Sequence, residues 1–169
     1  MSPRQRFYLI GQSCVGAAIA NAVINGAIGW GITRGGPLFP MWRLPGVAVD
    51  LVATAFGVTF GTCVCMAIQV PWDLGRGKIT PVSVSPGLAA VLARFPRGVL
   101  YRALGLGALS VAVFALPVVA ALAALGWGAM EREPYIVLKA ALSAFQGAIV
   151  TPFLVLAALG DVARRGAPG

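Results

Sequence analysis

Four polar side chains lie inside otherwise apolar stretches of the chain, and their spacing could form a site. Asn21 and Asn25 are four residues apart, so they share one face if this stretch is helical. Thr54 and Thr62 occupy a second apolar stretch. The amides offer donors and an acceptor, which could line a site for a polar ligand or a dehydrated ion. The alternative interpretation is that these side chains make hydrogen bonds between packed helices.

Residues that support catalysis or metal binding are sparse. The chain has no histidine, and its two glutamates, Glu131 and Glu133, stand in one short connection. Cys14, Cys63 and Cys65 fall in apolar runs, where a thiol behaves as a small hydrophobe. No nucleophile stands beside a base, and no metal-ligand spacing occurs. We therefore expect that the protein is not an enzyme and that it uses no cofactor and no metal.

The composition places these residues in a membrane protein. The 169 residues are 59% apolar and only 11% charged, with a mean hydropathy of +0.86. A soluble domain is about half apolar and about a quarter charged. The net charge of +8 comes from basic residues between long apolar runs, which excludes a nucleic-acid binder. The expected partners are the lipid bilayer and either further copies of the chain or another subunit of a membrane complex.

Four apolar runs reach the roughly 20 residues that are needed to cross a bilayer. They cover residues 7–32, 48–72, 99–128 and 135–160, which predicts an all-α membrane protein with four transmembrane helices. Nine Lys and Arg residues fall on one side of these spans and four on the other. This asymmetry predicts a bacterial inner-membrane protein with both termini in the cytoplasm.

The connections divide the chain into two helical hairpins, residues 1–78 and residues 99–169. Between them, residues 79–98 contain apolar residues at helical spacing. They predict a short cytoplasmic helix that either lies on the membrane surface or packs within the loop. The outer connection at residues 33–47 is rich in glycine and proline, and we expect an irregular, rigid loop there.

The second and fourth spans resemble each other. Residues 54–56 (Thr-Ala-Phe) align with residues 143–145 (Ser-Ala-Phe), and Gly-Trp-Gly closes both the first and the third span. The pattern predicts a duplicated two-helix unit whose copies are related by a pseudo-two-fold axis along the membrane normal. Shared apolar composition could account for part of the match.

The repeat places Asp50 and Lys139 at equivalent positions near the outer ends of their spans. A charge close to the membrane is tolerated when it finds a partner, and we predict that these two pair and join the halves. The alternative is that each marks a helix end, with Asp50 favoured by the helix dipole and Lys139 reaching outward.

Two further sets of residues mark the span ends. Asp73 with Arg76, and Asp161 with Arg164, are three residues apart and are expected to be neighbours at helix ends. Aromatic residues near the ends are expected to anchor the chain at the membrane interface. They are Tyr8, Trp30, Trp42, Trp72, Tyr101, Trp127 and Tyr135.

Glycine and proline predict how the spans pack and bend. Gly57 and Gly61 form a Gly-x-x-x-Gly motif, which lets another backbone approach closely, either the first span or a second copy. Pro117 and Pro152 lie mid-span and should kink their helices. The carbonyl that Pro152 frees needs a partner, which Thr151 or a buried water could supply.

Asn21-x-x-x-Asn25 with Trp30, the Gly-Gly-Pro outer loop and the Thr-Pro pair of the last span resemble a group of small four-helix bacterial inner-membrane proteins that are sometimes labelled permeases. The resemblance implies no substrate. We predict a protein that acts through helix packing, as an accessory subunit, an oligomer or a lipid-contacting scaffold. The alternative is a small transporter or channel that works as a homodimer.

Overall fold

The computed structural model describes residues 7–79 and 98–165, with side chains described as far as residue 162. Four helical segments are long and apolar enough to cross a membrane, as expected of a multi-pass membrane protein. The first joins η1 (Phe7–Gly16) to α2 (Ala17–Ile32), and the second is α3 (Val47–Gly75). The third comprises α5 (Val99–Ser110), η2 (Val111–Ala115) and α6 (Leu116–Ala124), and the fourth is α7 (Arg132–Arg165).

This architecture confirms the prediction of an all-α chain with four long apolar helices. The segments η1 and η2 are π-helical, so the first and third spans are not uniform α-helices. The π-helical turn of η2 lies directly before Pro117, where a missing backbone donor requires a local adjustment. The surface helix predicted between the hairpins falls on residues 80–97, which lie outside the described residues.

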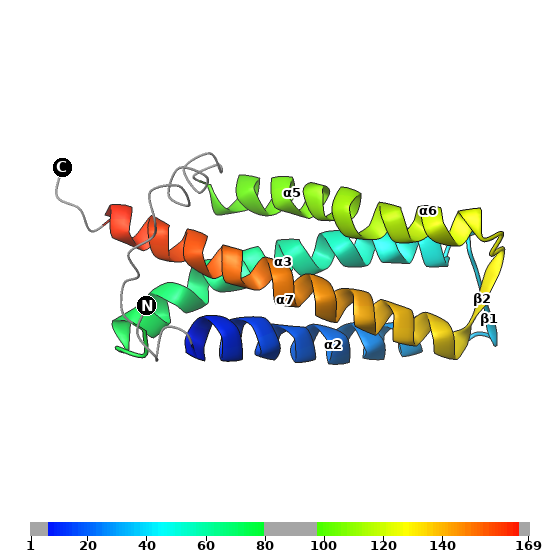
Figure 1. Cartoon of the computed structure of the whole chain (residues 1–169), viewed down its shortest axis with the longest axis horizontal. Coiled ribbons are helices and arrows are strands. Elements are labelled where there is room, and N and C mark those ends of the chain that lie inside the picture. Colours follow the sequence, from blue (N-terminus) through cyan, green and yellow to red (C-terminus); the bar gives the residue numbers. More distant parts are fainter. Residues whose placement is uncertain (1–6, 80–97, 166–169) are drawn as a thin grey trace.

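The helices of each predicted hairpin pack mainly against helices of the other hairpin. Helix α7 packs against both α2 and α3, and α3 packs against α5, whereas α2 and α3 share few contacts (Figure 1). The start of the first span and the end of α7 lie at one end of the bundle, which we call the far end. The strands labelled β1 and β2 lie at the other, the ribbon end.

A short antiparallel ribbon connects the two loops at the ribbon end. Strand β1 (Leu38–Pro40) pairs with β2 (Ala129–Glu131), and Phe39 lies opposite Met130. The prediction of an irregular loop at residues 33–47 is therefore wrong for residues 38–40, because a segment some 90 residues away supplies the backbone partners. The ribbon seals a buried cluster that includes Phe39, Met130 and Tyr135.

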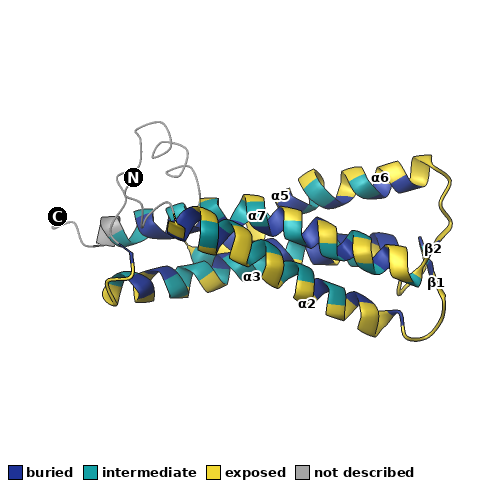
Figure 2. Ribbon diagram, turned by 60° about the horizontal axis from the view of Figure 1, so that its bottom comes forward, coloured by how far each residue is buried: buried dark blue, intermediate teal, exposed yellow. Residues whose placement is uncertain are grey.

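The apolar core is narrow, and large apolar side chains cover the outward faces of the helices. Figure 2 shows exposed residues along the outer faces of α2, α5 and α6. Examples are Ile19 and Val23 of α2, Leu109 of α5 and Leu116 of α6, each of which is at least half exposed. Such a surface is far more apolar than that of a soluble monomer and suits a hydrocarbon solvent.

Candidate functional site

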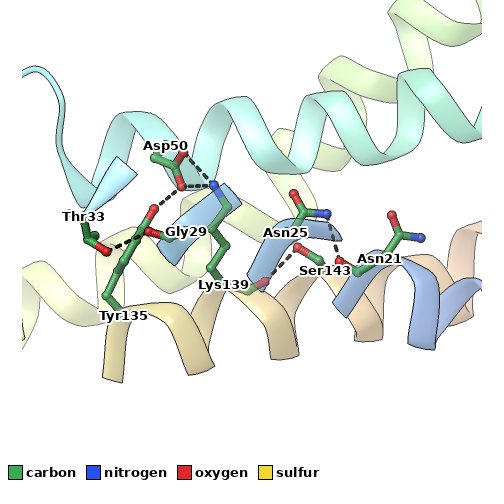
Figure 3. A network of polar contacts seen from close by, with 8 residues as sticks. All are labelled: Asn21, Asn25, Gly29, Thr33, Asp50, Tyr135, Lys139 and Ser143. Carbon is green, nitrogen blue, oxygen red and sulfur yellow. Dashed lines mark hydrogen bonds and ion pairs between the residues drawn. The ribbon is translucent and has the colours of Figure 1, made fainter. Parts of the chain in front are cut away.

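The predicted pairing of Asp50 with Lys139 is present in the structure (Figure 3). Lys139 Nζ lies 2.7 Å from Asp50 Oδ1 and 2.6 Å from Oδ2, and the Tyr135 hydroxyl donates a hydrogen bond to the same carboxylate. The Lys139 side chain is 1% exposed and that of Asp50 is 18% exposed. Tyr135 was expected to be an interfacial anchor, but it is fully buried because the ribbon covers it.

Helix register and a glycine place this pair. Helices α3 and α7 both begin at the ribbon end and run side by side, so Asp50 in the first turn of α3 meets Lys139 in the second turn of α7. Gly29 of α2 makes room for the lysine stem, since a Cβ there would lie 3.3 Å from Lys139 Cδ. The two opposite charges are in contact, and the pair joins α3 to α7.

A second polar group links three helices near mid-length. Gln146 Nε2 of α7 donates to the Ala55 carbonyl at 2.6 Å and lies 2.7 Å from Thr59 Oγ1 of α3. Thr59 Oγ1 lies in turn 2.6 Å from Ser110 Oγ of α5. Gln146 was not predicted as a contact residue. The available signal was the same as for the asparagines, an amide inside an apolar span.

At the far end, Asp73 and Asp161 both have partners on other spans. The Tyr8 hydroxyl donates to Asp73 at 2.9 Å, and Lys78 lies 3.2 Å from the same carboxylate. Arg102 of α5 lies 2.6 Å from Asp161 of α7. Tyr8 is thus a buried hydrogen-bond donor, whereas an interfacial anchor was expected.

These contacts correct the predicted pair of Asp73 with Arg76, whereas the predicted pair of Asp161 with Arg164 stays a prediction. Asp73 pairs with Lys78 rather than Arg76, whose guanidinium instead lies 4.2 Å from the centre of the Trp72 ring. Asp161 pairs with Arg102, and the side chain of Arg164 lies outside the described part of the chain. Spacing along a helix identifies neighbours, but a charge in a packed bundle binds the partner that tertiary structure brings closest.

The asparagines of α2 do not make the interhelical hydrogen bonds that the packing interpretation requires. Asn21 Nδ2 donates to the Ala17 carbonyl at 2.9 Å, and Asn25 Nδ2 donates to the Asn21 carbonyl at 3.0 Å. Figure 3 shows both amide groups on the side of α2 that faces α3. Within the described residues, neither amide oxygen has a hydrogen-bond partner, and neither Thr54 nor Thr62 makes a side-chain hydrogen bond.

The asparagines and threonines instead line one groove of about 570 Å³ between α2 and α3, with α7 at its base. Gly57 and Gly61 lie on its α3 wall, and a Cβ at either position would meet nothing within 4 Å. The predicted close approach of this glycine motif to the first span is therefore wrong. Among the residues of the groove are Ala17, Ala20, Asn21, Asn25, Ala53, Thr54, Thr62, Cys65 and Thr151.

Other glycines carry the close helix contacts. At Gly147 of α7, a Cβ would lie 2.6 Å from Asn21 Nδ2, so the absence of a side chain lets α7 reach α2. At Gly107 of α5, a Cβ would lie 2.8 Å from the Phe56 ring of α3. Small residues thus act as the membrane environment requires, but at positions other than the sequence motif.

The base of the groove also holds an unsatisfied polar atom. Thr151 is 1% exposed, and its Oγ1 has no hydrogen-bond partner in the structure. The expectation that Thr151 satisfies the carbonyl freed by Pro152 is therefore not met. Its hydroxyl is a donor and an acceptor held without a partner beside the groove.

The groove offers hydroxyl, amide and thiol groups that can bind a polar ligand. Within residues 7–79 and 98–162, no group of three His, Cys, Asp or Glu side chains could hold a metal ion. All three cysteines are free, and Cys65 is exposed on the groove wall. Comparison of the chain with protein-family models, with curated proteins and with solved structures gives no match, so the resemblance to small four-helix inner-membrane proteins stays a prediction.

Proposed function

We propose that this protein is a membrane scaffold, an accessory subunit that acts by associating with other proteins inside the bilayer. The observation that supports this function best is the pairing of charges. Beyond the first turn of α7, every charged side chain that the structure describes inside the spans takes part in an ion pair. A transporter that couples to protons needs an ionisable group that is free to change partners within the membrane.

The same contacts give the bundle the rigidity of a scaffold. The ion pair of Asp50 with Lys139 joins α3 to α7, and that of Arg102 with Asp161 joins α5 to α7. The polar contacts of Thr59 connect α3 to both α5 and α7. Interhelical hydrogen bonds in membranes contribute about 0.6 kcal/mol each on average. Their main effect is to specify one arrangement, because an unpaired polar group in hydrocarbon is costly.

The packing also supports the proposed duplication. If the two halves are exchanged, α2 takes the place of α5 and α7 takes the place of α3. The contact of α2 with α7 then becomes the contact of α5 with α3, and both contacts are extensive. Asp50 and Lys139, which the repeat aligns, lie side by side where an axis between the halves would pass. From this packing we infer that the chain consists of two duplicated units. From the asymmetry of Lys and Arg residues across the membrane we infer that it lies in a bacterial inner membrane with both termini in the cytoplasm.

A homodimeric transporter or channel is the second candidate, and the groove that reaches Asn25 favours it. The two functions differ in what they do to solutes. Extraction of native membranes into polymer nanodiscs, followed by mass measurement, is expected to give a complex larger than the 17.3 kDa chain. Proteoliposomes of the purified chain are expected to leak ions no faster than empty vesicles.

Two results would contradict the scaffold. The first is a chain that is monomeric in its native membrane under all conditions. The second is solute flux that the Asn25→Leu substitution abolishes while the substituted protein keeps its helical content. Either result would favour the transporter or a protein that acts alone.

A further inference from the structure

We propose that the groove between α2 and α3 binds a single transmembrane helix of a partner protein, one that carries small residues and hydroxyl or amide donors on its contacting face. This inference rests on the proposed scaffold function and names the class of partner. The groove runs from Asp50 to Met66 on α3, which is roughly 24 Å at 1.5 Å per residue. That length covers most of the roughly 30 Å of hydrocarbon that a partner helix must cross.

The walls of the groove have the shape that a helix backbone requires. Ala17 and Ala20 form part of the α2 wall, and Gly57 and Gly61 form part of the α3 wall. Both glycines open onto empty space, so a second backbone can approach α3 without displacing a side chain. Small residues at such spacing are the usual means by which transmembrane helices pack closely.

The polar atoms of the groove indicate what the occupant must offer. Thr151 Oγ1 is buried at the base without a partner, and the amide oxygen of Asn25, a residue only 8% exposed, has none within the described residues. Hydrocarbon cannot satisfy these groups, and each unsatisfied polar group in the bilayer core is costly. An acyl chain in the groove would leave both groups unpaired. A Ser, Thr, Asn or Gln side chain on a helix would pair the amide oxygen of Asn25, and it would reach the enclosed Thr151 Oγ1 once the walls of the groove shift to admit the helix.

A second copy of the chain fits the groove less well than a different helix. From Leu104 to Ala124, the exposed residues of α5, η2 and α6 are all apolar, and so are the exposed residues of α2 from Ile19 to Ile28. Neither face offers a donor to Thr151 or Asn25. A two-fold dimer whose axis passes through the groove would also place one groove against another, and two concave surfaces leave a void between them.

The test uses a synthetic transmembrane peptide and the full chain in phosphatidylcholine vesicles. The peptide has a Leu background, a Gly-x-x-x-Gly stripe with two Ser on the same face, and a dansyl acceptor for energy transfer from the four native tryptophans. A matched peptide has Leu in place of the Gly and Ser residues. We expect transfer to the first peptide to saturate with concentration, and transfer to the second to match that of random mixing.

Substitutions in the groove separate docking from general association. Gly57→Leu with Gly61→Leu fills the groove and is expected to weaken peptide binding by about tenfold or more. Gly105→Leu is the control, since Gly105 lies exposed on α5 with nothing within 4 Å of a Cβ. Thr151→Val keeps the side-chain shape and removes the hydroxyl, which should weaken binding of the Ser peptide by about threefold, the worth of one interhelical hydrogen bond.

Several results would overturn the inference. These are equal binding of both peptides, binding that survives the filled groove, and absence of binding by either peptide. Bimane on Cys65, which lies on the groove wall, gives a separate measurement. If brominated lipid quenches the bimane fluorescence and the peptide does not reduce this quenching, lipid rather than the peptide occupies the groove. If the nanodisc complex persists in the filled-groove variant, the docking site is wrong while the scaffold function stands.

Discussion

The ion pair of Asp50 with Lys139 makes a quantitative prediction, because its two partners are buried to different extents. Replacement of Asp50 by Asn removes one charge and leaves the ammonium of Lys139 almost fully enclosed, at 1% exposure. Replacement of Lys139 by Met removes the other charge and keeps the stem that packs against Gly29. The two single variants and the double variant form a cycle that measures the coupling between the two charges.

The single variants should not cost the same. Asp50→Asn leaves a buried, uncompensated charge, for which about 3–5 kcal/mol is expected. Lys139→Met leaves a carboxylate that is 18% exposed and still accepts the hydrogen bond of Tyr135. That carboxylate also lies in the first turn of α3, where the helix dipole contributes about 0.3–1 kcal/mol. We therefore expect this substitution to cost only about 1–3 kcal/mol, the usual result of losing a hydrogen-bond partner.

The double variant is expected to be close to the parent in stability, within about 1 kcal/mol, because no unpaired charge remains. The coupling energy is then close to the sum of the two single costs, about 4–8 kcal/mol, which exceeds the roughly 0.5–3 kcal/mol usual for residues in contact because each single substitution leaves a buried group without its partner. The assay is reversible unfolding in mixed detergent micelles, followed by the loss of helical circular dichroism. Lys78→Met serves as the control, since Lys78 is 56% exposed and its pair with Asp73 should contribute at most about 1 kcal/mol.

Single substitutions that cost equal amounts, and that add in the double variant, would show that Asp50 and Lys139 are independent markers of their helix ends. A double variant as unstable as Asp50→Asn alone would show instead that the cost comes from loss of the Asp50 carboxylate and not from the unpaired ammonium of Lys139. Either result would refute the reasoning from the buried, unpaired charge.

Three further substitutions test the packing. Gly147→Ala places a methyl group against the Asn21 amide and should cost about 1–3 kcal/mol in the same assay, whereas Gly105→Ala should be neutral or stabilising; equal effects would contradict the glycine contact. Gly46→Ala forces a Cβ into a backbone carbonyl and should open the ribbon, with faster hydrogen exchange over residues 38–47; unchanged exchange would refute this. Gln146→Leu loses two hydrogen bonds but also an unpartnered carbonyl oxygen, so the change should stay within about 1 kcal/mol; a larger loss would show that the central polar group stabilises the fold.

The long apolar helices could be predicted from the sequence because the requirement for them is one-dimensional. A bilayer needs a certain length of apolar chain, and that length is visible in the order of residues. The contact between Asp50 and Lys139 could be predicted from the sequence for a related reason. Equivalent positions in a repeat have the same depth, so two opposite charges at one depth are candidates to meet.

The partners at the far end could not be predicted, because sequence spacing reports only neighbours on the same helix. Asp73 binds Tyr8, which lies 65 residues away, and Asp161 binds Arg102, which lies 59 residues away. These contacts depend on the rotation of each helix about its own axis. When nearly every side chain on a span is apolar, the sequence carries little information about that rotation.

The same uncertainty explains why the first span was wrong as the partner of the glycine motif, whereas a second copy stays a prediction. Gly57 and Gly61 have the spacing of a packing motif, yet they open onto the groove, while Gly147 makes the close contact. The ribbon was missed because strands of three residues have no visible periodicity, and β1 includes Pro40, which favours a turn or an edge strand.

The distribution of polar contacts also indicates which wall of the groove can adjust. Ion pairs and hydrogen bonds join α3, α5 and α7 at several depths. By contrast, no side-chain hydrogen bond or ion pair within the described residues joins α2 to another helix. Helix α2 is held to α7 by close packing at glycines, and at the ribbon end by Arg132, 5.4 Å from the Trp30 ring centre. Dispersion contacts tolerate small shifts better than directional bonds do, so α2 is the wall that can move when a helix enters, while α3 and α7 keep the rest of the site fixed.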